Sequence, residues 1–318
     1  MNEAPFLSIV IVNWNAAQRL RRCLEALSFD IRSGAHDDVE IVVVDNGSRD
    51  VSLAAVCKAL PEAILIELPR NLGFAGACNV GIANASGEWL ATLNNDVRVE
   101  PGWIAAMRRA AAECGSACGM LQSCILGADR PTRIDSTGVV VRRSGEIQDR
   151  DRDNSARQSS PAGEVFCVSA GAAWYRRRML DEVSPDGRVF DPDYFMYFED
   201  VDLGWRCRLA GWSARYVPDA VVLHELHGSA GAHEVGFVKR QCARNRIRTV
   251  LGNGSTRFVA GAMPRLVRDI VWLLADTGHR AVLDVARAIR AGLTSRRALP
   301  PASRRARSRV EAAWFTSQ

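Results

Sequence analysis

Polar side chains stand at the ends of two apolar runs near the start of the chain. The first run, residues 7–15, reads LSIVIVNWN, and the second, residues 40–48, reads EIVVVDNGS. In an open α/β sheet, the carboxyl ends of the strands border the crevice where ligands bind. Four side chains at that edge offer hydrogen-bond donors and acceptors that could read a nucleotide: Asn13, Asn15, Asp45 and Asn46. The two runs therefore indicate an enzyme that uses a nucleotide.

Four further residues could carry acid, base or metal chemistry. Asp96 follows an apolar run at 89–93, His224 ends the run AVVLH, and Glu199 and Asp200 adjoin at the start of a helical pattern. Each also has an ordinary structural explanation. Acidic residues favour helix starts because of the helix dipole, and a histidine after a strand can simply belong to a loop.

Strand and helix patterns alternate over the first 113 residues. Apolar residues at helical spacing (Leu20, Cys23, Leu24 and Leu27) predict a helix capped by Asn15. Further helices are predicted from Ser48 or Asp50 through residue 60, over 75–85 and over 101–113, with strands over 39–44, 63–68 and 89–93. Because the strands alternate with helices, we expect a parallel sheet flanked by helices.

The pattern loosens between residues 127 and 163. A short strand is predicted at 138–142, and the polar segment 148–161 reads as a mobile lid or acceptor loop. Regular structure is predicted again over 164–169 and 171–179, in a helix over 199–210 closed by Gly211, and in a strand over 220–223. We place the catalytic domain at residues 1–254 and a helical tail at 255–318.

Composition limits the class of protein. A chain of 318 residues with 47% hydrophobic content can bury a full core. Its start carries Glu3 instead of a basic segment, so we expect no signal peptide. No apolar run reaches about eighteen residues, so we expect no transmembrane helix. We therefore expect a cytoplasmic location. The nine cysteines are odd in number and scattered without metal-site spacing, which predicts free, buried thiols.

Charge is distributed unevenly along the chain. Residues 239–318 hold 17 Lys and Arg against 4 Asp and Glu, whereas the first 238 residues hold 24 against 32. Amphipathic helices are predicted at 264–275 and 280–293, followed by an Arg-rich segment at 296–309. Three interpretations stay open: packing of these helices on the body, peripheral contact with an anionic membrane surface, and nucleic-acid binding. The small number of aromatic residues among the arginines argues against nucleic-acid binding.

Six segments, in order, carry a resemblance to a known family. They are VNWN (12–15), VDNGS (44–48), RNLGFAGACNVGI (70–82), LNNDV (93–97), FMYFEDVDLGWRCRLAGW (195–212) and HELHGS (224–229). Together they resemble glycosyltransferase family 2, and especially its rhamnosyltransferase-like bacterial branch. The resemblance covers roughly residues 7–250. It implies a GT-A fold, which is a Rossmann-like, mainly parallel mixed sheet between helices, here followed by the basic helical tail.

The resemblance implies a nucleotide-sugar site. The aspartate that matches Asp45 accepts the N3 proton of uracil or thymine, so a UDP- or dTDP-sugar is the expected donor; a turn-forming role for Asp45 is the alternative. Small residues in LGFAGACN allow close approach of backbone to the nucleotide. The expected nucleotide-binding set is Asn13, Asn15, Asp45, Asn46, Asn71, Gly73, Asn79 and Asn95.

The resemblance also implies a divalent metal. LNNDV stands where the family carries its metal-binding DxD element, but two of the usual carboxylates are asparagines here. Asp96 is the expected acidic ligand and His224 the expected second ligand, with His227 as the alternative. A carboxylate and imidazole set suits Mn²⁺ or Mg²⁺, with diphosphate oxygens completing the shell.

The acidic pair matches the family's catalytic position. By resemblance Asp200 is the base that deprotonates the attacking hydroxyl, and Glu199 binds or orients the acceptor. Asp202 is expected to pair with Arg206 one turn on. Three aromatic side chains are candidates for an acceptor-sugar surface, although aromatic clusters are commonly buried: Trp174, Tyr197 and Trp205.

These expectations describe an inverting transferase. It would move a sugar, with rhamnose as a candidate, from the donor to a saccharide or lipid-linked saccharide in bacterial cell-surface polysaccharide synthesis. The asparagines of LNNDV leave a catalytically inactive nucleotide-binding scaffold as one alternative. A nucleic-acid-binding protein that uses the basic tail is the other.

Overall fold

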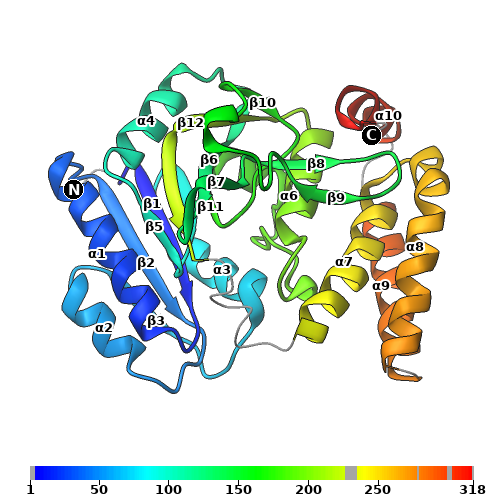
Figure 1. The fold of residues 1–318 in the computed structure, drawn as a ribbon, viewed down its shortest axis with the longest axis horizontal. Coiled ribbons are helices and arrows are strands. Elements are labelled where there is room, and N and C mark those ends of the chain that lie inside the picture. The colour runs from blue at the N-terminus through cyan, green and yellow to red at the C-terminus, as the bar shows by residue number, and fades with distance from the viewer. Residues whose placement is uncertain (1–3, 226–234, 278, 299–302, 317–318) are drawn as a thin grey trace.

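The computed structural model describes residues 4–225, 235–277, 279–298 and 303–316 (Figure 1). The strands are β1 (Leu7–Asn13), β2 (Val39–Asp45), β3 (Ile64–Glu67), β4 (Trp89–Asn94), β5 (Val97–Val99), β6 (Cys118–Gly127), β7 (Arg130–Ser136), β8 (Val139–Val141), β9 (Ile147–Asp149), β10 (Gly163–Val165), β11 (Ala172–Arg176) and β12 (Ser213–His224). The helices are α1 (Ala17–Ser33), α2 (Ser52–Ala59), α3 (Gly73–Ala83), α4 (Trp103–Glu113), α5 (Arg177–Val183), α6 (Glu199–Leu209), α7 (Val235–Asn253), α8 (Thr256–Thr277), α9 (His279–Ala298) and α10 (Ser303–Trp314).

One mixed sheet forms the centre of the molecule. Its main order is β10-β12-β6-β11-β4-β1-β2-β3, and β5 and β7 pair with β12 and β6. β1 runs parallel to β2 and β4, whereas β11 runs antiparallel to β4 and β6. In this register Asn13 lies opposite Asp45, so the polar strand ends share one edge. The predicted mainly parallel sheet flanked by helices is confirmed.

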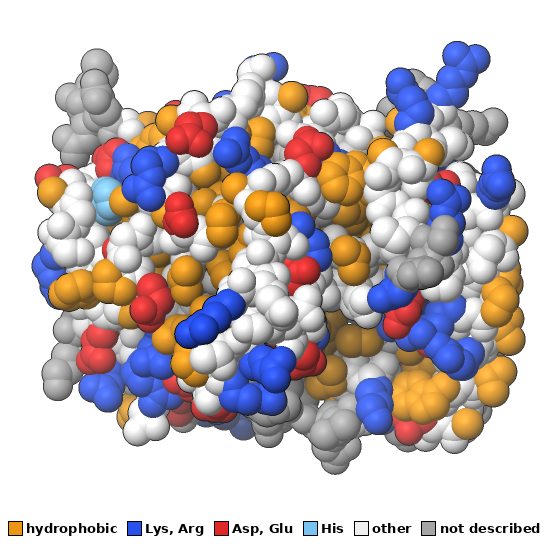
Figure 2. Space-filling view, turned by 45° about the horizontal axis from the view of Figure 1, so that its top comes forward, with side chains coloured by type: hydrophobic (Ala, Val, Ile, Leu, Met, Phe, Trp, Pro, Cys, Tyr) orange, Lys and Arg blue, Asp and Glu red, His pale blue; other side chains and the backbone are white. Residues whose placement is uncertain are grey.

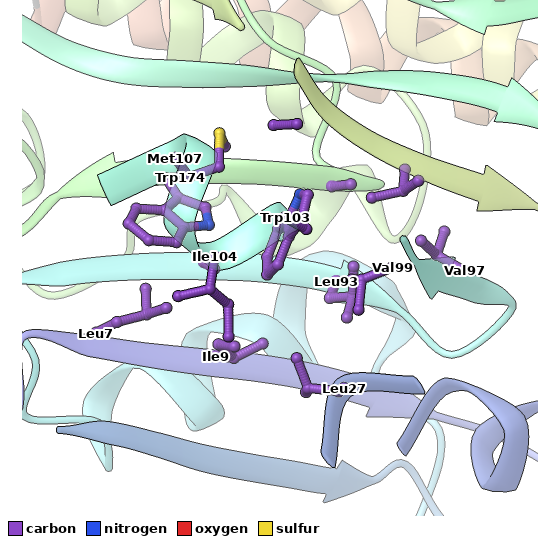
Figure 3. Packing of buried hydrophobic residues seen from close by; sticks show 14 of the residues in the cluster. Leu7, Ile9, Leu27, Leu93, Val97, Val99, Trp103, Ile104, Met107 and Trp174 are labelled. Atoms are coloured by element: carbon purple, nitrogen blue, oxygen red, sulfur yellow. The ribbon is translucent and has the colours of Figure 1, made fainter. Parts of the chain in front are cut away.

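Helices cover both faces of this sheet. On one face α1 and α4 bury Leu27 and Trp103 against the strands (Figure 3). On the other face α3, α5 and α6 bury Ala77, Met179 and Leu203. Because both faces are covered, the central strands are apolar throughout, which is why their sequences read as continuous hydrophobic runs.

The start of α1 differs from the prediction that Asn15 caps it. Asn15 has a φ of 48°, and its Oδ1 accepts the N–H of Arg49 at 2.8 Å. The carboxylate of Asp50 accepts the N–H groups of Ala17 and Ser52, each at 3.1 Å. One side chain therefore satisfies donors at the first turns of both α1 and α2.

The segment between residues 127 and 163 is more regular than its sequence suggests. β7 pairs with β6, the predicted strand at 138–142 is β8, and β9 returns against β8. Side-chain bonds from Thr137 and Ser160 to Asp151 fasten the following turn. Within the polar segment 148–161, where the sequence predicts a loop, β9 covers the first two residues and a 3₁₀ turn covers Ala156–Gln158. The residues between them form turns, so the segment is irregular only in part.

The C-terminal helices pack on the body through a third hydrophobic cluster. It joins Phe166 and Trp205 of the body to Phe258 and Leu266 of α8 and to Phe315 beyond α10. The proposed boundary at residue 254 falls between α7 and α8, and this cluster extends across it.

The apolar face predicted on the helix at 264–275 is present in α8, but only part of it is covered. Leu266 and Leu273 are buried against the body, whereas Val267, Val271 and Leu274 are exposed. One edge of the face is therefore buried and the adjoining edge is exposed, because the face is too wide to be covered by one neighbour.

Part of the basic charge of the C-terminal region is paired internally. Arg240 and Arg246 form ion pairs with Asp276 and Asp269 at 3.0 and 2.7 Å. Arg307 donates to a backbone carbonyl at residue 252. The interpretation that the C-terminal region packs on the body therefore accounts for these three arginines, although other arginines face solvent.

Two expectations from composition can be compared with the structure. Among the described residues, no helix is both long and apolar enough to cross a membrane. The eight cysteines whose side chains are described all carry free thiols, and seven of them are buried. The expectation of buried free thiols is confirmed for those seven.

The aromatic cluster around Phe315 provides a test of how firmly the tail joins the body. Its ring lies 5.0 Å from that of Trp205 and 4.8 Å from that of Phe258, measured between centroids. We predict that Phe315→Ala lowers the free energy of unfolding in urea by about 3 kcal/mol, because a buried ring is lost. Val282→Ala, at an exposed site of α9, should change it by less than about 0.5 kcal/mol. Equal effects would show that the tail is not part of the folding unit.

Candidate active site

A cavity of about 630 Å³ opens at the polar edge of the sheet. Its walls come from the loops after β1, β2 and β4, the start of α3, the β7–β9 region, the loop before α6, and α7. Ten of the candidate residues line it: Asn15, Asn46, Asn71, Gly73, Asn95, Asp96, Tyr197, Glu199, Asp200 and His224. Residues predicted from separate segments of the sequence therefore meet in one place.

A chain of buried amides connects the strand ends behind this cavity. Asn95 Nδ2 donates to Asn13 Oδ1 at 2.8 Å, and Asn13 Nδ2 donates to Asp45 Oδ1 at 3.3 Å. The other oxygen of Asp45 accepts the N–H of Ser48 at 3.0 Å. Asn13 and Asp45 are not among the residues that line the cavity. These contacts are those of a turn-forming Asp45, the alternative role considered from the sequence.

The next loop is shaped by two asparagines. Asn46 Nδ2 donates to Asn71 Oδ1 at 3.0 Å, and Asn46 Oδ1 accepts the N–H of Leu72 at 2.8 Å. The following residue, Gly73, has a φ of +75°, and a Cβ there would lie 2.3 Å from the carbonyl oxygen of Phe195. Only glycine fits, because both the φ value and the close approach exclude a side chain.

The amide of Asn79, a predicted nucleotide-binding residue, is engaged in contacts within the protein. Its Nδ2 donates to the carbonyl of Phe190 at 2.6 Å and its Oδ1 accepts the N–H of the same residue at 2.9 Å. Asn79 does not line the cavity. Its amide joins α3 to the segment before α6, so packing explains why an asparagine stands there.

Asp96 and His224 meet at the end of β4 and β12. Both carboxylate oxygens of Asp96 are buried without a hydrogen bond, and one lies 3.4 Å from His224 Nε2. Buried carboxylate oxygens need a partner, and a divalent cation between these two side chains would supply one. Within the described ranges no three His, Cys, Asp or Glu side chains form a ready metal cluster. His227 lies outside the described residues.

A third residue, Asp135 of β7, orients His224. Its Oδ2 lies 2.7 Å from His224 Nδ1. Burial lowers the pKa of His224, but the hydrogen bond to Asp135, the close contact with Asp96 and the charges of both carboxylates outweigh it and raise that pKa to about 10. A carboxylate on one ring nitrogen fixes the imidazole so that the other nitrogen faces Asp96. The sequence did not single out Asp135, because it stands in a polar segment with no recognisable spacing.

Glu199 and Asp200 enter the cavity at the first turn of α6. Asp200 accepts the N–H groups of Ala170 at 3.1 Å and Val201 at 2.7 Å, while Glu199 Oε2 is buried without a hydrogen bond. Burial raises the pKa of both carboxyl groups, and the charge of Asp200 raises the pKa of Glu199 further. A carboxylate with a raised pKa is a stronger base than an exposed one.

The loop that leads into α6 has an unusual backbone. Phe195, Tyr197 and Phe198 have φ values of 64°, 68° and 72°. Such values are costly for residues with large side chains. The loop persists because Asn245 of α7 donates from Nδ2 to the carbonyls of residues 194, 196 and 197 at 3.0, 2.9 and 2.7 Å. Asn245 is fully buried, and no pattern in its neighbourhood of the sequence marks it.

The aromatic candidates divide into one cavity residue and two core residues. Tyr197 lines the cavity. Trp174 is buried against Trp103 (Figure 3), and Trp205 is buried between Phe166 and Phe315. The predicted acceptor contacts of Trp174 and Trp205 are therefore wrong. Both tryptophans point into hydrophobic clusters, which the sequence could not separate from the cavity.

Two charged residues of the β9 region also line the cavity. Burial raises the pKa of Asp149 to about 6, and the charges of Asp135 and Asp200 raise it while a bond from Ser136 lowers it. Arg152 lies 3.0 Å from Asp149 and 3.4 Å from Asp135. The sequence indicated a functional loop here but not these side chains. Asp202 pairs with Arg206 at 2.9 Å, as predicted.

The site can now be compared with known proteins. The sequence profile of glycosyl transferase family 2 matches residues 8–184 of this chain. This chain belongs to that family. The profile covers β1 to α5 and so includes the nucleotide edge and Asp96, whereas Glu199, Asp200 and His224 lie beyond it.

Two curated relatives of this family 2 glycosyltransferase are named for rhamnosyl transfer and for succinoglycan biosynthesis. The N-acetylglucosaminyl-diphospho-decaprenol L-rhamnosyltransferase of Mycobacterium tuberculosis is 30% identical over 254 residues, or 71% of this chain and 78% of the relative. The succinoglycan biosynthesis protein ExoO of Rhizobium meliloti is 35% identical over 145 residues, or 45% of this chain and 40% of ExoO.

Two solved structures share the fold at low sequence identity. The mannosyltransferase PcManGT of Pyrobaculum calidifontis, in complex with GDP-Man and Mn²⁺, has a TM-score of 0.56 at 17% identity and covers 98% of this chain and 88% of its own. GalNAc-T7, with UDP, GalNAc and Mn²⁺, has a TM-score of 0.61 at 14% identity, covering 100% and 56%. The glycosyltransferase described here has the GT-A fold.

The bonds of Asn245 provide a stability test. We predict that Asn245→Leu, which keeps the volume but removes the donors, lowers the free energy of unfolding by about 3 kcal/mol, because buried carbonyls lose their partner. Asn84→Leu is the matched control, since its exposed amide bonds only within α3 and its loss should cost less than about 1 kcal/mol. Equal urea midpoints for Asn245→Leu and the wild type would contradict the role assigned to Asn245.

Proposed function

We propose that this glycosyltransferase is an inverting, metal-dependent enzyme. It transfers a sugar, with rhamnose as the leading candidate, from a UDP- or dTDP-sugar to a saccharide or lipid-linked saccharide acceptor. One observation supports this more than any other: a single cavity brings the unsatisfied carboxylate of Asp96 together with the acidic pair Glu199 and Asp200. The carboxylate of Asp96 suits the binding of a metal-bound diphosphate, and the acidic pair suits deprotonation of a hydroxyl.

Asp96 and His224 would hold the divalent cation, Mn²⁺ or Mg²⁺. Such an ion supplies charge stabilisation for the departing diphosphate. The fit rests on the two Asp96 oxygens without partners and on the imidazole that Asp135 turns toward them. With two protein ligands, diphosphate and water oxygens would complete the shell.

In the proposed reaction Asp200 takes the proton of the acceptor hydroxyl as its oxygen attacks the anomeric carbon. The bond from the anomeric carbon to the diphosphate breaks in the same displacement, so the configuration inverts and no covalent enzyme intermediate forms. The N–H groups of Ala170 and Val201 hold the carboxylate in place. Glu199 orients the acceptor, and Tyr197 contributes an aromatic surface beside it.

The donor base would be read at the polar edge of the sheet. In this proposal Asp45 accepts the N3 proton of uracil or thymine, using lone pairs that its bonds to Asn13 and Ser48 leave available. Asn15, Asn46, Asn71, Gly73 and Asn95 line the adjoining wall. The two structural neighbours hold GDP-Man and UDP, so they do not choose between bases.

A catalytically inactive nucleotide-binding scaffold is the second candidate. The observation in its favour is that Asn94 and Asn95 stand where acidic metal ligands are expected, so the described metal ligands are few. A protein that binds nucleotide but shows neither sugar transfer nor donor hydrolysis would support this candidate.

Substitution of the proposed base tests the mechanism. We predict that Asp200→Asn lowers sugar transfer by about 10²–10⁴-fold while nucleotide binding is unchanged. In the wild type, kcat/KM should fall as the pH drops through the raised pKa of Asp200, above the ordinary value of 3.8, because the base must be unprotonated. Asp181→Asn, at an exposed position of α5, should leave transfer unchanged. Full activity in Asp200→Asn would exclude its role as the base.

A thermal-shift comparison tests the donor site. UDP or dTDP should raise the melting temperature more than GDP or CMP, and Mn²⁺ should increase that shift, since a ligand at 100 times its Kd adds about 2.7 kcal/mol of stability. Asp96→Asn should remove the increase due to Mn²⁺, and Asp45→Ala should remove the preference for the pyrimidine. Equal shifts with all four nucleotides would contradict the reading of the base by Asp45.

A further inference from the structure

Helix α8 carries an apolar face that no other part of the described chain covers. Its side chains are between 39% and 58% exposed, and they recur at helical spacing on one side: Met263, Val267, Val271 and Leu274. The adjoining side of α8 is already buried in the third hydrophobic cluster through Ala262, Leu266 and Leu273. The outer face is therefore not needed to hold the helix in place.

Helix α9 extends this surface. It packs against both α7 and α8, and its exposed apolar side chains are Val282, Leu283 and Leu293. Figure 2 shows hydrophobic and basic side chains interspersed at the right-hand edge of the molecule, where these C-terminal helices lie in Figure 1. The name "α8–α9 face" is used below for the seven exposed apolar side chains of the two helices.

The charges beside the α8–α9 face have one sign. Three exposed arginines of the two helices have no ion pair with a described residue: Arg257, Arg268 and Arg290. The described carboxylates of the same helices are paired. Asp269, Asp276 and Asp284 lie 2.7, 3.0 and 3.5 Å from Arg246, Arg240 and Arg287, respectively. The surface is therefore apolar and cationic.

We infer that the α8–α9 face docks on an anionic lipid bilayer. Exposed valine, leucine and methionine side chains would enter the boundary between headgroups and acyl chains, and the arginines would contact lipid phosphates. The apolar burial and the electrostatic attraction act on the same surface, so both contribute to the same binding free energy. The helices lie in the plane of the interface and do not cross it, in keeping with their length and apolar content among the described residues.

Two other occupants fit the surface less well. A two-fold contact between the α8–α9 faces of two copies would bring like-charged arginines together, and the described carboxylates of α8 and α9 are already paired. Single-stranded nucleic acid would use the arginines but not the aliphatic side chains, because bases stack on aromatic rings and the exposed large hydrophobics of α8 and α9 are all aliphatic.

The position of α7 connects this surface to the cavity. α7 packs against both α8 and α9, and its residues Val238, Cys242 and Arg246 line the cavity. α7 and the layer formed by α8 and α9 therefore lie between the cavity and the α8–α9 face, and packed helix axes lie about 8–10 Å apart. The idea that a lipid-linked acceptor is delivered from this face to the cavity rests on the proposed function. The inference that the face docks on lipid does not rest on it.

Vesicle co-sedimentation of the full chain tests the inference without any catalytic readout. The protein should sediment with vesicles of phosphatidylcholine and phosphatidylglycerol, and much less with phosphatidylcholine alone. The double variant Val267→Glu and Val271→Glu should lower partitioning by about tenfold or more, because apolar contacts are replaced by charges that anionic lipid repels. Arg268→Gln should weaken binding and reduce its dependence on salt.

The matched control makes the same change elsewhere. Val51→Glu alters an exposed valine far from α8 and α9, and it should leave partitioning unchanged. All variants should keep the wild-type melting temperature, since the altered side chains are exposed. No binding of the wild type to anionic vesicles would overturn the inference, as would equal losses in Val51→Glu and the double variant. Concentration-dependent dimers that disappear in the double variant would instead assign the surface to a second copy of the chain.

Discussion

The amide of Asn245 holds the loop on which the acidic side of the cavity depends. Three residues of that loop have left-handed φ values, each costing about 1–3 kcal/mol, so the loop needs support from outside itself. Asn245 supplies it by bonding to three carbonyls, and the contact between Gly73 and Phe195 fixes the other side. Glu199 and Asp200 follow directly, so their positions are set by residues distant in sequence.

This support explains why the helices beyond the sheet belong to the working structure. α7 carries Asn245 on one side and the cavity residues Val238 and Arg246 on another. It is itself packed between the body and α8 and α9, and the cluster around Phe315 closes over α6. The C-terminal region therefore contributes to the shape of the cavity through the element it supports, in addition to its exposed outer surface.

The sheet and its polar edge could be predicted because they follow from local patterns. Apolar runs that end in polar residues place Asn13 beside Asp45 once the strands are parallel. Contacts between distant segments could not be predicted. Nothing local distinguishes Asn245 from a surface asparagine, and nothing local shows that Trp174 is fully buried in the core. Asp135 was missed because its strand lies exposed at the sheet edge.

The order of strands in the sheet has a consequence for folding. β1, β2 and β3 join through parallel pairings close in sequence, with Asn13 opposite Asp45 and Asp45 opposite Glu67. β4 pairs with β1, β11 with β4, and β12 with β6 only when much longer loops close. Long-range pairing is slow because loop-closure entropy is lost first. During refolding, the strand ends that carry Asn13 and Asp45 should therefore gain protection from hydrogen exchange before β4, β11 and β12 complete the sheet.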